Sequence, residues 1–121
     1  MKRWMMKRLI AWKNDAHRKP LILDGARQTG KSWLVKEFGR TQFESMAYVS
    51  LENNEAMDQL FSGSLRPERL IAGIALASRT RIEPGKTLIV LDEVQAIPRA
   101  VEALKYFAEE ACEYALIATG S

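Results

Sequence analysis

The 121-residue chain has little of what several classes of protein depend on. It holds a single cysteine, Cys112, so it has no internal disulfide, which fits a reducing compartment. Its single histidine, His17, has no second histidine or cysteine pair nearby, so a metal role is not expected for it. No apolar stretch approaches the roughly 20 residues that cross a bilayer, and the start of the chain lacks the apolar core of a secretory signal. These absences predict a cytoplasmic protein without a membrane partner.

The composition that remains is ordinary for one soluble globular domain. Hydrophobic residues make up 47% of the chain and charged residues 27%. No repeat, low-complexity tract or linker divides it, so residues 1–121 are predicted to form a single domain, with an N-terminal helix and connection over 1–19 and a core over 20–121. The net charge is a mild +3. Much of it comes from basic residues near the front: Lys2, Arg3, Lys7, Arg8, Lys13, Arg18 and Lys19.

Residues 25–32 match the phosphate-binding pattern G-x-x-x-x-G-K-[ST] in full, directly after the strand-like run 21–23. Gly25 and Gly30 let the backbone curl so that its N–H groups face a phosphate, and the helix that follows adds its positive end. We expect Lys31 to reach the β- and γ-phosphates and Ser32 to ligate Mg²⁺. The candidate nucleotide-binding residues are Gly25, Ala26, Arg27, Gln28, Thr29, Gly30, Lys31 and Ser32. The loop predicts binding of ATP and ADP with Mg²⁺.

The second half of an ATPase site is predicted at Asp92 and Glu93. They follow the aliphatic run 88–91, which is typical of a strand covered on both faces, so Asp92 is expected at the edge where α/β sheets bind ligands. We assign Asp92 to the magnesium ion and Glu93 to general-base catalysis, because a hydrolase must deprotonate water. Taken alone, the pair would be interpreted as a solvated acidic turn. Together with the phosphate loop, the functional interpretation is favoured.

Strands are predicted over 20–24, 46–51, 88–93 and 114–119, and helices over 2–14, 32–38, 55–61, 67–78 and 99–112. This alternation predicts an α/β fold, a three-layer sandwich with a mostly parallel sheet. Gly39 is expected to end the second helix, and Trp33, Val101 and Cys112 to pack in the core. The basic helix over 2–14 is expected to pack on the sheet. The alternative is that it lies on a membrane or a phosphate backbone.

With these motifs, the chain resembles the N-terminal ATPase part of prokaryotic AAA+-type P-loop proteins whose longer members carry a nuclease-like C-terminal domain. The shared segments are Trp12-Lys13, residues 18–23, residues 25–32, residues 88–95, residues 104–107 and Thr119-Gly120-Ser121. The resemblance implies that Ser121, or otherwise Thr119, senses the γ-phosphate. It also implies that Asn53 or Glu52 holds the catalytic Glu93 until a partner binds.

The resemblance further implies elements beyond Ser121: a fifth strand, a helical lid with a basic sensor, and an arginine finger. The expectation is therefore a truncated AAA+ core that binds ATP better than it hydrolyses it and that self-associates through an exposed sheet edge. Two hypotheses stay open. The chain is an ATPase module, or it is a non-catalytic nucleotide-binding or interaction module that docks on a protein or nucleic acid. Measured ATP turnover separates them.

Overall fold

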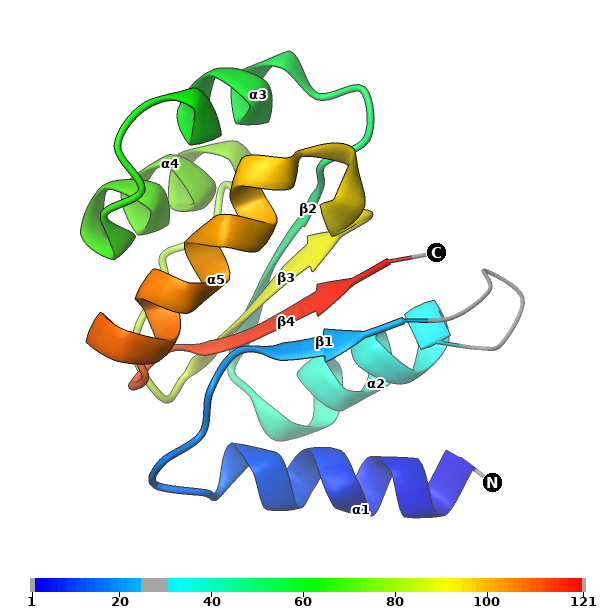
Figure 1. Ribbon diagram of the computed structural model, residues 1–121. Helices are drawn as coiled ribbons and strands as arrows, with labels where there is room; N and C mark the ends of the chain where they lie inside the picture. Colours follow the sequence, from blue (N-terminus) through cyan, green and yellow to red (C-terminus); the bar gives the residue numbers. More distant parts are fainter. Residues whose placement is uncertain (1, 25–30, 121) are drawn as a thin grey trace.

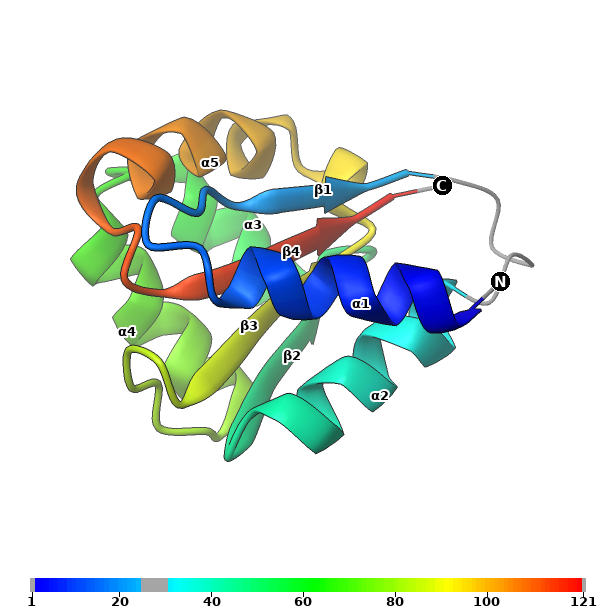
Figure 2. The ribbon, with the colours of Figure 1, turned by 90° about the horizontal axis from the view of Figure 1, so that it is seen from below.

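The computed structural model describes residues 2–24 and 31–120, with side chains over 4–24 and 33–120. Four strands form one sheet, and helices cover both of its faces (Figures 1 and 2). In chain order the elements are α1 (Lys2–Lys13), β1 (Leu21–Leu23), α2 (Lys31–Gln42), β2 (Ser45–Ser50), α3 (Glu55–Ser62), α4 (Pro67–Ser78), β3 (Thr87–Asp92), the 3₁₀ helix η2 (Val94–Ala96), α5 (Pro98–Glu110) and β4 (Ala115–Thr119). The predicted α/β three-layer architecture is confirmed.

The strands lie in the order β1-β4-β3-β2, and every neighbouring pair is parallel. The register places Leu23 beside Thr119 and Ser50 beside Asp92. Since the strands run in one direction, their carboxyl ends meet at a single edge of the sheet, where α/β folds bind ligands. Within the described residues β1 pairs only with β4 and forms the outer strand.

The two central strands explain why the apolar runs of the sequence are so continuous. All residues of β4, and all of β3 before Asp92, are buried, because helices cover both faces of the sheet. Leu88 and Val90 face the cluster formed with α1 and α2. Ile89 and Leu91 alternate with them and face the larger cluster formed with α3, α4 and α5.

The predicted end of the second helix at Gly39 is wrong, because α2 continues to Gln42. Gly39 is buried against the sheet, and a Cβ atom built there would lie 2.6 Å from Met46 Sδ and 3.2 Å from Leu88 Cδ2. The glycine therefore allows the helix backbone to approach β2 and β3 closely. Helix C-caps and close helix–sheet contacts both favour glycine, and the sequence alone does not separate them.

Three predicted core positions are exposed instead. Trp33 is 52% exposed on the first turn of α2, and Val101 is 43% exposed on α5, whose buried side carries Leu104 and Phe107. Cys112 is exposed in the turn that follows α5, since the helix ends at Glu110. Each residue is apolar enough for a core, but the helix period or the helix end turns it away from the sheet.

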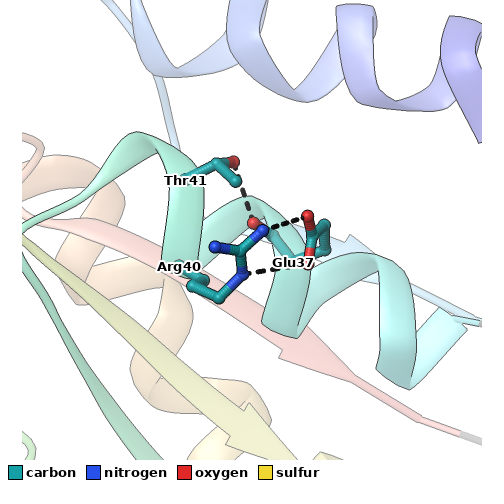
Figure 3. Close-up of polar contacts among 3 residues, drawn as sticks. All are labelled: Glu37, Arg40 and Thr41. Atoms are coloured by element: carbon teal, nitrogen blue, oxygen red, sulfur yellow. Dashed lines mark hydrogen bonds and ion pairs between the residues drawn. The ribbon is translucent and has the colours of Figure 1, made fainter.

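The last turn of α2 is held by contacts within the helix (Figure 3). Arg40 donates to both carboxylate oxygens of Glu37, with N–O distances of 3.1 and 2.5 Å, and the Thr41 hydroxyl donates to the Glu37 carbonyl at 2.8 Å. The hydrogen bond from Arg40 lowers the pKa of Glu37. Arg40 is thus a cation with a carboxylate partner on its own helix.

None of the helices in the described part of the chain has the length and apolar character to traverse a bilayer.

Candidate functional site

The carboxyl edge of the sheet brings together the end of β3, the end of β4 and the start of α2, which lie far apart in the sequence (Figure 1). Asp92 is the last residue of β3, and Glu93 follows it directly. Lys31 and Ser32 form the start of α2, which lies at the same edge. Thr119 ends β4, the strand beside β3. The sheet therefore positions the candidate metal and base residues beside the helix that follows the phosphate loop.

Part of the predicted site lies outside the described residues. These are positions 25–30 of the phosphate loop and the candidate sensor Ser121. Of Lys31 and Ser32 the structure describes the helical backbone. The geometry that follows therefore concerns the carboxylate side of the site.

Hydrogen-bond donors from three of the described residues hold the Asp92 carboxylate. The Tyr48 hydroxyl donates to Oδ2 at 2.5 Å, and the Thr119 hydroxyl donates to Oδ1 at 2.6 Å. The backbone N–H of Glu93 also donates to Oδ1, at 3.1 Å. Hydrogen bonds to an ionised acceptor are shorter and stronger than neutral ones. They hold the carboxylate in one orientation at the edge of the sheet.

Tyr48 reaches Asp92 from the neighbouring strand β2 and is itself half-buried. Burial, together with the hydrogen bond to Asp92 and the nearby Glu93 charge, raises the pKa of Tyr48 well above its ordinary value. The phenol therefore stays protonated and keeps donating. On the other side, the Lys36 ammonium of α2 lies 5.1 Å from the Tyr48 ring centroid, a cation–π contact. Tyr48 thus connects α2 to the carboxylate.

Glu93 is buried and has a left-handed backbone, with φ +55° and ψ +50°, at the start of η2. This conformation costs a residue other than glycine about 1 kcal/mol, and such strain clusters at functional sites. Its side chain accepts a hydrogen bond from Gln95 Nε2 at 2.8 Å. Asn53, one of the residues expected to hold Glu93, is exposed and also has a positive φ, +51°. Gln95, a donor to Glu93, lies two residues further along the chain.

The ends of β1 and β4 approach each other at Gly120. Its N–H donates to the Leu23 carbonyl at 3.1 Å. A Cβ atom built at Gly120 would lie 2.9 Å from Gln95 Oε1 and 3.3 Å from Asp24 Oδ1. A larger residue would push against both polar side chains, so glycine keeps Gln95 in reach of Glu93.

Comparison of the sequence with models of protein families identifies the family of this chain. The chain matches a family model described as AAA domain over residues 17–121. It is a member of the AAA domain family. No curated protein matches the chain. The match covers both motif regions of this AAA domain and starts after α1, so α1 lies outside the matched part.

The donor chemistry of the AAA domain suits magnesium. Mg²⁺ takes oxygen ligands and is commonly held by one or two carboxylates together with substrate phosphates, and Asp92 presents carboxylate oxygens at this edge. Among the described residues there is no group of three or more histidine, cysteine or acidic residues that could hold a metal ion by itself.

The sequence did not identify two residues of the site. The sequence predicts a strand at Tyr48, but only the register of β2 against β3 brings its hydroxyl to Asp92. Gln95 belongs to the Asp-Glu-Val-Gln segment, which carried the family resemblance without a role. Thr119, the alternative candidate for the γ-phosphate sensor, donates a hydrogen bond to Asp92.

Proposed function

We propose that this AAA domain binds Mg-ATP at the carboxyl edge of its sheet and hydrolyses the bond between the β- and γ-phosphates. The observation that carries the proposal is the Asp92–Glu93 pair at the end of a buried strand, with Asp92 fixed by Tyr48 and Thr119. The phosphate loop at 25–32 supplies the phosphate contacts, with Lys31 as the charge partner of the β- and γ-phosphates.

Ser32 and Asp92 are the residues assigned to Mg²⁺, which would neutralise charge that develops on the phosphates. Glu93 takes the proton of the attacking water, while the water oxygen bonds to the γ-phosphorus and the bond to ADP breaks. Gln95 orients the Glu93 carboxylate through its hydrogen bond. Ser121 is assigned to sense the γ-phosphate. Catalysis of this kind depends mostly on positioning the reacting groups, and carboxylates held in place at the edge of the sheet provide such positioning.

Calorimetry with a matched pair of lysine variants tests the binding step. Lys31→Ala removes the main cationic partner of the phosphates, so it should abolish most of the affinity for Mg-ATP. Lys105→Ala removes an exposed lysine on α5 and should leave affinity unchanged. Equal binding by wild type and Lys31→Ala would refute the assignment.

Glu93→Gln tests the chemical step. It keeps the size of the side chain and removes the base, so ATP should still bind while turnover falls about 100-fold or more. The second hypothesis, a non-catalytic nucleotide-binding or interaction module, predicts ATP binding without turnover above background in the wild type itself. Phosphate release by wild type and Glu93→Gln, measured side by side, therefore separates the two functions.

A further inference from the structure

The helices on the two faces of the sheet carry opposite charge. Together α1 and α2 contain eight basic residues and one acidic residue. On the opposite face α3, α4 and α5 contain three basic and six acidic residues. Figures 1 and 2 show the two groups of helices on either side of the sheet. The mild net charge of the chain hides this separation, which gives one face a positive field.

The side chains of three basic residues on α1 are described: Lys7, Arg8 and Lys13. Within the described residues, no acidic group lies within salt-bridge distance of Lys7, Arg8 or Lys13. Arg8 instead lies 5.5 Å from the Trp4 ring centroid, and Lys13 lies 5.2 Å from that of Phe43. Four arginines elsewhere do pair with glutamates: Arg40, Arg66, Arg81 and Arg99.

This concentration of charge works against the helix. The twelve residues of α1 include five basic ones and no acidic one. Its first turn lacks the acidic residue that would stabilise a helix N-terminus, and repeated like charges repel one another. A polyanionic partner would offset that repulsion.

The packing of α1 argues against a membrane surface as that partner. Leu9 is buried, and Met5, Met6, Ile10 and Trp12 pack against the same core cluster. An interfacial helix inserts its apolar face into the lipid, whereas the apolar face of α1 packs against α2 and the sheet. Trp4, 51% exposed, is the large apolar side chain that α1 leaves in solvent, among Lys7 and Arg8.

We infer that the outward face of α1 binds single-stranded nucleic acid, with Lys7 and Arg8 on the phosphates and Trp4 stacked on a base. Positive side chains that follow a phosphate backbone, next to an exposed aromatic ring, are the combination that binds single strands without sequence preference. A duplex offers the phosphates but no free base face for the indole. The interaction requires no nucleotide in the ATP site, so it is tested without ATP or Mg²⁺.

The test is fluorescence anisotropy of a labelled oligothymidylate of roughly 20 nucleotides with the full chain. The double variant Lys7→Ala/Arg8→Ala should weaken binding about 10-fold or more and reduce the slope of log affinity against log salt by about 1.4. The matched double variant Arg81→Ala/Lys105→Ala removes the same charge at exposed positions away from α1 and should change neither quantity. Trp4→Ala should weaken binding roughly 10-fold, and Trp4→Phe should restore part of it.

Several results would overturn the inference. One is an equal loss of affinity in both double variants, which would indicate that binding depends on the net charge of the protein and not on α1. Another is unchanged affinity of Trp4→Ala, which removes the stacking role. Stronger binding to phosphatidylserine vesicles, or to a second copy of the chain, than to the oligonucleotide would assign the face to a different partner. Circular dichroism verifies that each variant is folded, and failure to bind ATP would leave this result unaffected.

Discussion

At the scale of single residues, the carboxylate side of the site depends on hydrogen-bond donors from neighbouring strands. Asp92 ends β3, while its donors Tyr48 and Thr119 belong to β2 and β4. Each strand alone supplies one polar group. Only the parallel register makes them a constellation around one carboxylate.

Tyr48→Phe should loosen this constellation while keeping the aromatic ring. Losing a hydrogen bond to an ionised group is expected to lower the free energy of unfolding by about 1–3 kcal/mol. It should also reduce the part of ATP affinity that depends on Mg²⁺, because Asp92 is no longer held in one orientation. Urea unfolding and calorimetry with and without Mg²⁺ measure the two effects. Tyr114→Phe, a half-buried tyrosine next to β4, is the matched control. If the two variants behave alike, Tyr48 has only a packing role.

At the scale of elements, α2 is positioned by the close approach of its backbone at Gly39. Gly39→Val adds branched volume where even a single added Cβ would lie 2.6 Å from Met46 Sδ, so the free energy of unfolding should fall by about 1–3 kcal/mol. Gly39→Ala should cost less, since the flexible end of Met46 can move and alanine favours the helix. Chemical denaturation of both variants measures this. A Gly39→Val protein as stable as the wild type would mean that α2 is not held tightly on the sheet.

The helix α1 should contribute to the stability of the fold, although it lies before the residues that match the family. Leu9 is 2% exposed in the cluster beneath α1 and α2, so Leu9→Ala should lower the free energy of unfolding by about 2–5 kcal/mol. Lys7→Ala on the exposed side of the same helix should change it by less than about 0.5 kcal/mol. Equal effects of the two variants in thermal unfolding would show that α1 does not pack on the sheet.

At the scale of the whole molecule, β1 forms the outer strand of the described sheet and has only three residues. Ile22 at its middle is 47% exposed. An exposed apolar edge favours association between molecules. We expect light scattering by the wild type to rise with protein concentration. It should decrease in Ile22→Lys, because a charged side chain on an edge strand opposes pairing with another molecule. Identical scattering by both proteins would remove β1 as the associating surface.

Nucleotide binding should also be visible in the stability of the whole domain. A ligand that binds only the folded state at about 100 times its dissociation constant adds about 2.7 kcal/mol. Mg-ATP should therefore raise the Tm of the wild type by several degrees and leave Lys31→Ala unchanged. Differential scanning fluorimetry provides the measurement. A shift of equal size in both proteins would indicate binding elsewhere.

The sequence alone predicted the order and type of the strands and α-helices, though not the 3₁₀ helix η2, and each strand boundary lies within one residue of its prediction. It did so because period, turn residues and apolar runs are local properties of the chain. It also singled out Asp92 and Glu93, since acidic residues after a buried strand are a local signal. The tertiary structure decided which groups meet them. Tyr48, Gln95 and the close contact at Gly39 depend on register and on helix–sheet distance, which arise only when separate segments pack together.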